Sequence, residues 1–481
     1  MFWKGVIGYL PANLVQAVTG LLAIVVFTRL LTPEAYGAYA VAFSVTTLVH
    51  TGLFTWLEAA MARYQAREAE LGGLPAHMAT LYRSALALAF AVPIVGGVLL
   101  FVIPLMPEVR AAVLAGLLSI PLRNLVKLAQ ERRRAAGEVR ASAALDISQS
   151  AGAFGFGAAL AWMGAGGAAP LAGFALAALV TLAWVLPREL KHAPGGRFEA
   201  ARAREYARFG LPVALSMIMA LVVSSTDRLM IAGLLGEASA GVYHAGYSLS
   251  NRTLDVLFIW LGMAGGPAAV AAFERGGLAA LQREAREQAS LILLICVPAA
   301  AGLALVARPL ADVMIGEQMR SGAAQVTPWI ALGGFFAGVT THYLYQAFTL
   351  ARRTGLVIVA LGVPAVLNVA LNLLLIPRFG LSGAMWAAAA SYAAGAAAAL
   401  LLGRRVMPLP IPLATLGKVL LTAAGMAAAV LALPAWGGFP ELALKAGVGA
   451  AVYALLAIAL DIAGARSRLG GLARTVQANA A

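Results

Sequence analysis

The sequence has almost no cysteine and unusually little charge. Its single cysteine, Cys296, lies inside an apolar run, which excludes a disulfide framework and a thiolate metal site. Only 12% of the 481 residues are charged, about half the share that is typical of soluble domains. With 61% hydrophobic residues and a mean hydropathy of +0.85, the chain is expected to be a polytopic membrane protein.

Sequence motifs of catalysis are also missing. There is no His-Glu-x-x-His zinc pattern, no Gly-x-x-x-x-Gly-Lys-Ser/Thr phosphate loop and no Gly-x-Ser-x-Gly nucleophile elbow. No loop has room for a large soluble domain, which argues against an ATP-driven pump. We therefore expect no enzyme activity, no catalytic residue, no cofactor and no metal, although a membrane glycosyltransferase or polysaccharide polymerase stays open.

The net charge of +14 does not indicate nucleic-acid binding. The basic residues are dispersed between apolar segments, and no basic face is interleaved with aromatic residues. We therefore expect no nucleic-acid partner. Short basic loops of this kind instead suit retention beside anionic lipid.

Long apolar runs are the main feature that the sequence does have. About twenty apolar residues suffice to cross the hydrocarbon core as a helix. Such runs are predicted at residues 6–31, 38–62, 81–104, 110–130, 141–163, 168–186, 209–235, 241–270, 288–307, 323–350, 355–376, 381–402, 415–434 and 442–463. The expected fold class is an all-α polytopic membrane protein with about fourteen transmembrane helices.

The loops between these runs alternate in charge. Loops after the even-numbered runs, together with Lys4, hold about 25 of the 35 basic residues. Because loops rich in Lys and Arg stay in the cytoplasm, both termini and the basic loops are predicted to be cytoplasmic. The alternation also supports the helix count, since one missed helix would disturb every later loop.

The longest connection, residues 187–208, divides the chain near its middle. We predict an N-terminal lobe at 1–186, a cytoplasmic linker at 187–208, a C-terminal lobe at 209–402, and two further helices with a cytoplasmic tail at 403–481. Apolar residues at helical spacing predict a short interfacial helix over 198–209, and the loop at 273–287 receives the same interpretation.

One turn is repeated between the two predicted lobes. Residues 29–39 read RLLTPEAYGAY, and residues 234–243 read LLGEASAGVY, which keeps two leucines, an acidic turn and Gly-x-Tyr. In both copies a proline or glycine ends one apolar helix and a glycine follows near the start of the next. Chance similarity of two hairpins is the alternative, but the shared setting favours a duplicated, transporter-like architecture.

These segments carry a resemblance to a known family. RLLTPEAYGAYA (29–40), STDRLMIAGLLGEASAGVYHAGYSLS (225–250) and NLLLIPRFGLSGAMWA (372–387) resemble the polysaccharide-exporter family of Wzx-type O-antigen flippases. That family belongs to the superfamily of the lipid II flippases and the multidrug and toxin extruders (MATE). The resemblance implies two pseudo-symmetric six-helix lobes plus two C-terminal helices, in a MATE-like arrangement.

The resemblance also implies a function. It implies a flippase of the bacterial inner membrane that moves a polyprenyl-diphosphate-linked oligosaccharide from the cytoplasmic to the outer leaflet by alternating access. Such a protein would serve the assembly of O-antigen, capsule or exopolysaccharide. Its partners would be the lipid-linked oligosaccharide, the bilayer, and a polysaccharide polymerase with its chain-length protein. The last two helices would offer the polyprenyl tail a groove.

Ionisable side chains inside apolar helices are costly, so they are expected to face a cavity or a partner. Arginine offers a fork of donors to phosphate oxygens, and only a titratable or cation-binding group senses an ion gradient. The predicted head-group and cavity residues are Asn13, Gln16, Arg123, Lys127, Arg228, Tyr247, Asn251 and Arg252. The predicted ion-coupling residues are Glu58, Asp146, Asp227 and Asp255.

Structural roles are open for several of these residues. Asp227 and Arg228 lie near a helix end, where they could pair or extend toward water. Arg252 could pair with the carboxylate three residues further on. The basic residues of the run 110–130 could neutralise Asp146 instead of binding a diphosphate.

Three other functions stay open. A drug or metabolite cation antiporter of the same fold would have an aromatic-lined cavity in which acidic groups dominate, and Arg123 and Arg252 argue against it. A lipid II flippase is a second alternative. A scaffold for polysaccharide assembly is a third, and it would not depend on cavity charges.

Overall fold

The computed structural model describes residues 2–190, 195–353, 355–464 and 466. Every regular element in these ranges is helical and none is a strand, which confirms the predicted all-α class. The physical reason is that hydrocarbon offers no water to backbone polar groups, whereas a helix satisfies them within one segment. Residues 191–194 of the predicted linker and the predicted basic tail beyond 466 lie outside the described residues.

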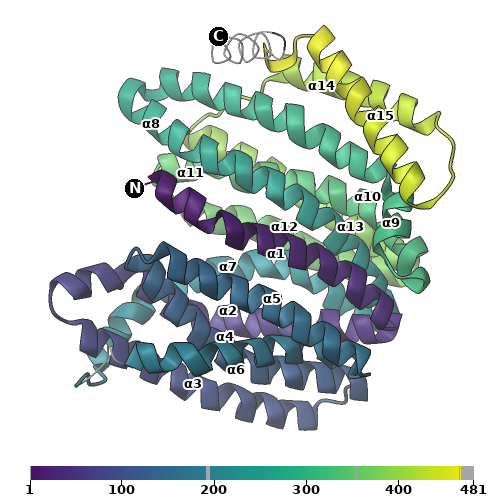
Figure 1. Ribbon diagram of the computed structural model, residues 1–481. Coiled ribbons are helices and arrows are strands. Elements are labelled where there is room, and N and C mark those ends of the chain that lie inside the picture. Colours follow the sequence, from purple (N-terminus) through teal and green to yellow (C-terminus); the bar gives the residue numbers. More distant parts are fainter. Residues whose placement is uncertain (1, 191–194, 354, 465, 467–481) are drawn as a thin grey trace, which may run out of the picture. The chain divides into compact units, whose positions relative to one another are not determined.

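Figure 1 labels the helices in chain order. They are α1 (Phe2–Leu30), α2 (Pro33–Glu70), α3 (Leu74–Val102), α4 (Pro107–Ala135), α5 (Val139–Trp162), α6 (Ala169–Leu190), α7 (Ala200–Leu235), α8 (Glu237–Leu305), α9 (Ala307–Met314), α10 (Glu317–Val339), α11 (Gln346–Leu350), α12 (Gly355–Phe379), α13 (Leu381–Val406), α14 (Leu413–Leu431) and α15 (Gly438–Ala459). Single 3-10 turns lie at Gly166–Ala168 and Ile462–Gly464, and a π-helical turn lies at Thr340–Leu344.

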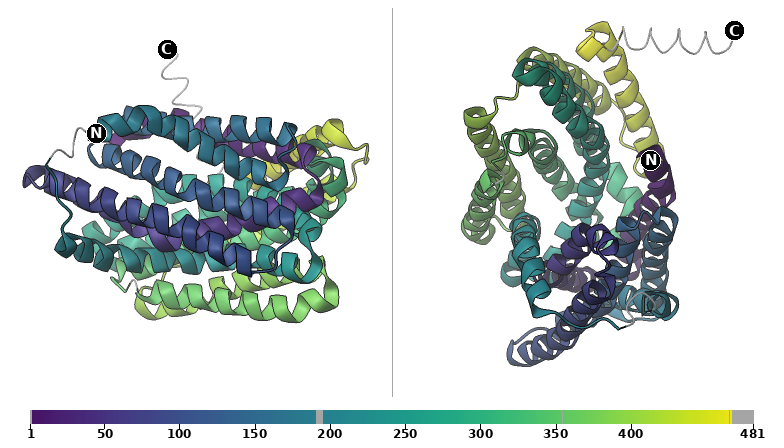
Figure 2. Two further views of the ribbon diagram at one scale, coloured as in Figure 1. Left: turned by 90° about the horizontal axis from the view of Figure 1, so that it is seen from below. Right: turned by 90° about the vertical axis from the view of Figure 1, so that its left-hand side faces the viewer.

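The described chain divides into two compact units, Met1–His244 and Ala245–Ala481. Within each unit most helices run side by side (Figures 1 and 2). In the first unit α2 packs against α4 and α7, and α5 packs against α1 and α6. In the second unit α10 and α12 pack against α13, and α14 packs against α15. Helix α7 thus packs with the first unit. The division of the duplicated chain into two lobes at residues 187–208 stays a prediction.

Each of the fourteen predicted runs falls on a helical stretch, but several helices extend well beyond the apolar residues. Eleven of the described helices are long and apolar enough to cross a membrane, and α8 alone contains two of the predicted runs. The predicted run 323–350 is divided by the π-helical turn between α10 and α11.

The two predicted interfacial helices are wrong. Residues 200–209 are the beginning of α7, which continues through Gly210 and Pro212. This segment is rich in Ala, Arg and Glu, and extending an existing helix requires no new nucleus. Residues 273–287 span the kink of α8 at Gly276 and Gly277, and the residues after the kink are the beginning of the helical stretch that ends at Leu305. Gly277 has φ +62°, which glycine adopts without steric cost.

Both copies of the repeated turn begin a helix in a well-defined way. Thr32 caps α2, because its hydroxyl accepts a hydrogen bond from the Ala35 amide at 3.2 Å, and Pro33 occupies the first helical position. In the second copy, Gly236 has φ +89° and separates α7 from α8. The acidic residue that follows in each copy lies in the first turn of its helix, where the helix dipole favours negative charge.

The two copies of the turn contact each other backbone to backbone. A methyl group added at Gly37 would overlap the carbonyl oxygen of Glu237, the first residue of α8. A methyl group added at Gly241 would overlap the carbonyl oxygen of Pro33, the first residue of α2. Each glycine is the fifth residue of its helix, so the contact is reciprocal. Such reciprocity is what a local two-fold relation between duplicated segments produces, and it supports the predicted repeat.

The opposite end of the first unit holds a set of ion pairs. Arg202 at the start of α7 pairs with Glu68 near the end of α2. Arg132 and Arg133 of α4 both contact the buried Glu189 carboxylate of α6, at 2.9 and 2.6 Å. Buried arginines require such partners. The basic loops predicted after the second, fourth and sixth helices therefore meet at one end of the first unit, which we call the basic end.

We expect Gly37→Ala to lower the free energy of unfolding by about 1–3 kcal/mol, because its methyl group requires the two helix starts to separate. The measurement is thermal unfolding of the protein purified in detergent. Gly233→Ala is the matched control, since no atom lies within 4 Å of its added methyl group. Equal melting temperatures for the two variants would contradict the close contact.

Candidate functional site

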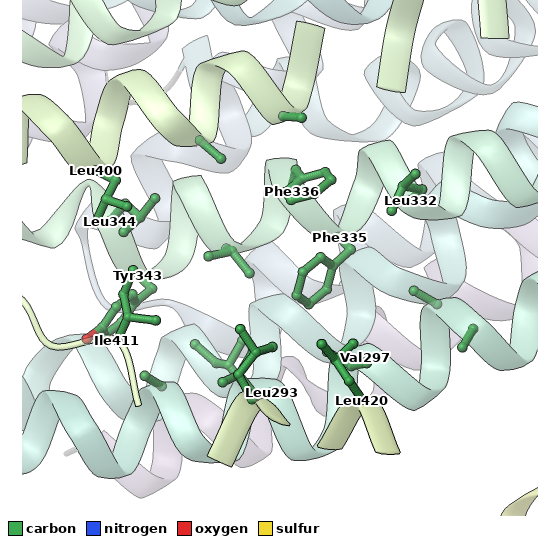
Figure 3. A pocket seen from close by; sticks show the side chains of 18 of the residues that line it. Leu293, Val297, Leu332, Phe335, Phe336, Tyr343, Leu344, Leu400, Ile411 and Leu420 are labelled. Carbon is green, nitrogen blue, oxygen red and sulfur yellow. The ribbon is translucent and has the colours of Figure 1, made fainter. Parts of the chain in front are cut away.

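A ligand-sized apolar cavity lies in the second unit. Its volume is about 810 Å³, which is within the range of small-molecule sites. Its walls come from residues 289–304 of α8, from α10, the π-helical turn, α13, the segment before α14, and α14 itself. Figure 3 shows the larger side chains of these elements surrounding the space.

Small side chains on two facing helices help to leave this space open. The lining alanines are Ala289, Ala300, Ala301 and Ala304 of α8 and Ala393, Ala396 and Ala397 of α13. Larger residues at these positions would fill the space at the packing density of a protein interior. Larger apolar and aromatic side chains form the rest of the α8 and α10 walls, including Leu293 and Phe336 (Figure 3) as well as Trp329.

The cavity wall presents almost no free polar group. The Tyr343 hydroxyl, in the π-helical turn, donates a hydrogen bond to the Pro410 carbonyl at 2.5 Å. Its polar atom is therefore already satisfied, and the ring and the neighbouring Leu344 line the cavity (Figure 3). A polar ligand would lose its hydrogen bonds to water here without replacement, so the site suits a hydrocarbon chain.

The first unit contains a polar cluster centred on Glu58 of α2. A hydrogen bond joins Glu58 Oε1 to His50 Nε2 at 2.9 Å, and Asn124 of α4 donates a second one to the same oxygen at 3.3 Å. The Glu58 and His50 side chains are 15% and 20% exposed. Two titratable groups thus share a hydrogen bond within one long membrane helix.

Arg123 lies next to this cluster in sequence. Its guanidinium carbon is 4.6 Å from the centre of the Phe174 ring of α6, which is a cation–π contact. Among the described residues no carboxylate lies within 4.0 Å of it. The Arg123 side chain therefore keeps donors for a further anion.

Asp146 has a different neighbour from the one considered in the sequence analysis. Its carboxylate is 4.0 Å from Arg134 of α4. Lys127 pairs with Glu131 on its own helix, at 3.2 Å. In the described part of the chain, neither Arg123 nor Lys127 forms an ion pair with Asp146, so the structure does not support the alternative that they neutralise it.

Asp227 and Arg228 of α7 are buried rather than extended toward water, with 1% and 5% of their surfaces exposed. Asp227 accepts a hydrogen bond from the Tyr243 hydroxyl of α8 at 2.7 Å. Arg228 donates one to the Ser44 hydroxyl of α2 at 3.5 Å. These contacts connect α7 to α8 and α2 in the first unit, close to the repeated turn.

The remaining polar residues of the first unit divide between exposed and buried positions. Asn13 and Gln16 are exposed on α1. Ser44, Thr47, Thr51 and Thr55 recur at intervals of three or four residues and form a polar stripe on α2, of which all but Thr47 are buried. The stripe is thus largely packed against neighbouring helices in this structure.

In the second unit, α8 carries the other predicted polar residues. Tyr247 and Asn251 are half-buried, whereas Arg252 and Asp255 are exposed. Asn251 donates a hydrogen bond to the Asp255 carboxylate at 2.5 Å. Arg252 lies near enough to Asp255 to attract its carboxylate electrostatically, although no ion pair within 4.0 Å joins the two among the described residues.

His50 and the walls of the apolar cavity are not among the residues predicted from the sequence. His50 was detectable as an isolated titratable residue eight positions before Glu58 in one apolar run. The cavity has a weaker sequence signal, the alanines of α8 and α13, because alanines are just as common where helices simply pack closely. Of the last two helices, α14 contributes to the described lining and α15 does not.

The fold resembles those of solved membrane transporters. A structure of the lipid II flippase MurJ, in an inward closed conformation, matches with a TM-score of 0.79 and 13% identity, covering 94% of this chain and 98% of that chain. An inward-facing MATE multidrug resistance transporter of the MOP superfamily matches with a TM-score of 0.66 and 15% identity, covering 81% of this chain and 94% of that chain. An outward-facing MATE transporter matches with a TM-score of 0.56 and 15% identity, covering 83% of this chain and 93% of that chain. The protein therefore has the fold shared by MurJ and the MATE transporters.

The chain belongs to the polysaccharide biosynthesis protein family, whose sequence model matches residues 26–323. The match extends from α1 into α10, so it includes both copies of the repeated turn and the Glu58 cluster. No curated relative matches the sequence. Family and fold together confirm the resemblance noted from the sequence, and they agree with the apolar helices of a multi-pass membrane protein.

We expect His50 and Glu58 to be energetically coupled. A double-mutant cycle of His50→Ala and Glu58→Ala should give a coupling free energy of about 0.5–3 kcal/mol, because each single change removes the same hydrogen bond. The measurement is denaturant unfolding in mixed micelles. His50→Ala combined with Asp146→Asn is the control, since no described contact joins them and their effects should add. Additive behaviour of the His50–Glu58 pair would show that the hydrogen bond contributes nothing.

Proposed function

We propose that this protein is a flippase for a polyprenyl-diphosphate-linked oligosaccharide. The observation that carries the proposal is the apolar cavity of the second unit in a member of a polysaccharide biosynthesis family. A saccharide is polar and gains nothing from such a wall, whereas the lipid part of a lipid-linked saccharide does. The fold of MurJ and the MATE transporters supports translocation as the activity.

The diphosphate head group would bind basic side chains that are not already paired with a carboxylate of the protein. Of the four predicted basic residues, Lys127 pairs with Glu131 and Arg228 bonds to Ser44. Arg123 and Arg252 have no ion pair within 4.0 Å among the described residues, so they are the stronger candidates. Asn13, Gln16, Tyr247 and Asn251 would offer hydrogen bonds to the head group from α1 and α8.

Ion coupling is assigned first to Glu58, because its hydrogen bond to His50 forms a site that can hold a proton. Protonation would remove the negative charge of Glu58 and weaken its attraction for the His50 ring and the Asn124 amide. Asp227 and Asp255 also hold hydrogen bonds, and Asp146 faces Arg134. These three carboxylates are the further candidates for coupling.

The proposal includes a direction and a place. Transport would run from the cytoplasmic to the outer leaflet of a bacterial inner membrane by alternating access of two six-helix lobes, with both termini and the basic end in the cytoplasm. The exported unit would supply O-antigen, capsule or exopolysaccharide assembly. A polymerase and a chain-length protein would take over the product.

Transport should depend on Arg123 and Arg252. In proteoliposomes with a fluorescent polyprenyl-diphosphate oligosaccharide, we expect Arg123→Gln and Arg252→Gln each to slow translocation about tenfold or more, because a charge-assisted hydrogen bond contributes roughly 1.5–3 kcal/mol. Arg405→Gln, at an exposed position near the end of α13, is the control and should transport normally.

Different substrates separate this proposal from the alternatives. The match to nearly the full length of MurJ favours lipid II as a second candidate, and preferential transport of lipid II over longer oligosaccharide lipids would support it. No transport of any saccharide lipid, together with proton- or sodium-driven uptake of a cationic drug, would overturn the flippase proposal.

The apolar cavity should bind the polyprenyl tail. Ala301→Phe places a ring in the cavity, and we expect the apparent affinity for long-chain polyprenyl substrates to fall about tenfold, while a water-soluble short-chain analogue is affected less. Transport rates against substrate concentration provide the measurement. Ala390→Phe, an exposed position of α13 that does not line the cavity, is the control. Equal losses for long and short chains would contradict a tail site.

A further inference from the structure

A second pocket lies at the basic end of the first unit, between the end of α2 and the start of α7. Its volume is about 480 Å³. The lining residues are Tyr64, Ala201, Arg204, Glu205, Arg208 and Phe209. None of them belongs to the apolar cavity or to the Glu58 cluster.

The pocket is strongly basic and has aromatic walls. Arg204 and Arg208 are exposed, and the Arg63 guanidinium lies 4.6 Å from the Phe209 ring centre. The carboxylate of Glu205, 3.4 Å from Arg67, is the acidic group of the lining. Arg204 and Arg208 line the pocket, and Arg63 and Arg67 contact its other lining residues, so positive charge exceeds the single negative charge of Glu205.

The apolar runs of the sequence predict that the pocket lies at the level where hydrocarbon gives way to water. The apolar run of α2 ends at residue 62, and that of α7 begins at residue 209. Along α7, Arg204, Arg208, Leu211 and Leu215 follow at intervals of four, three and four residues, which places them on one helix face. Leu211 and Leu215 are 50% and 49% exposed. One face of α7 thus presents two arginines and then, one and two turns deeper, exposed leucines.

We propose that this pocket binds the phosphate headgroup of an anionic phospholipid. Arg204 and Arg208 would donate to the phosphate oxygens in the forked geometry of guanidinium. Arg63, fixed over Phe209 and Tyr64, would add a third positive charge, and an acyl chain would follow Leu211 and Leu215. A neutral zwitterionic lipid would gain less here, because its cationic group would meet the surplus arginines.

The bound lipid would contact α2 and α7 together. These helices pack against each other along the first unit, and Arg202 and Glu68 pair one turn further from the apolar region. A ligand that binds only the folded arrangement stabilises it by mass action. The inference does not depend on the proposed flippase activity, since it concerns a bilayer lipid and a separate pocket.

Native mass spectrometry of the full-length protein in neutral detergent tests this site. With dioleoyl phosphatidylglycerol as the probe, we expect Arg204→Gln/Arg208→Gln to weaken binding of the first lipid about tenfold or more. Arg404→Gln/Arg405→Gln removes the same charge from two exposed positions of α13, and the affinity for the first lipid should stay within about twofold of that of the unchanged protein. Arg204→Lys/Arg208→Lys, which keeps the charge but loses the fork, should lie between the two.

Three outcomes would overturn the proposal. The first is equal binding of phosphatidylglycerol to all variants. The second is no preference for phosphatidylglycerol over phosphatidylcholine in the intact protein. The third is displacement of the lipid by millimolar inorganic phosphate, or by polyprenyl diphosphate at equal concentration, because either result would assign the arginines to a different phosphate source.

Discussion

A polar group inside hydrocarbon is costly unless it has a partner, and this constraint accounts for much of the structure. It makes every described regular element helical, since a helix satisfies its own backbone. It also places Glu189 between two arginines at the basic end, where a lone buried charge would be costly. Within the helices, Glu58, Asp227 and Arg228 each hold a side-chain hydrogen bond.

Close backbone contact provides the second organising feature. At Gly37 and Gly241 the starts of α2 and α8 approach so closely that no side chain fits. In a membrane, helices associate through such packing and through hydrogen bonds, because lipid removes the hydrophobic drive between them. The two copies of the turn motif therefore pack directly against each other. The hydrogen bond from Tyr243 to Asp227 lies beside the same region.

The two units differ in chemistry. The first contains a titratable pair, a nearby arginine and buried polar bonds, whereas the second contains a cavity with almost no available polar group. The apolar cavity is the physical reason for proposing a lipid-linked substrate in a member of a polysaccharide biosynthesis family, since free sugars would gain nothing from its walls.

Much of the fold follows from the sequence. Apolar length indicated which segments form helices long enough to cross a membrane, the repeated turn indicated the duplication, and the loop charges indicated which helix ends meet at the basic end. The family resemblance was also readable, because the motifs around residues 29–40 and 225–250 are local in sequence.

Other features required the tertiary structure. Apolar length cannot show that α7 continues through 200–209, because water-exposed helix has no apolar signal. Partner choice between helices was equally hidden: Asp146 of α5 faces Arg134 of α4, and Glu58 of α2 accepts a hydrogen bond from Asn124 of α4. Sequence spacing limits contacts along one helix, whereas contacts between helices depend on their rotation and depth. The apolar cavity is the clearest case, since alanines create space only where facing helices leave it unfilled.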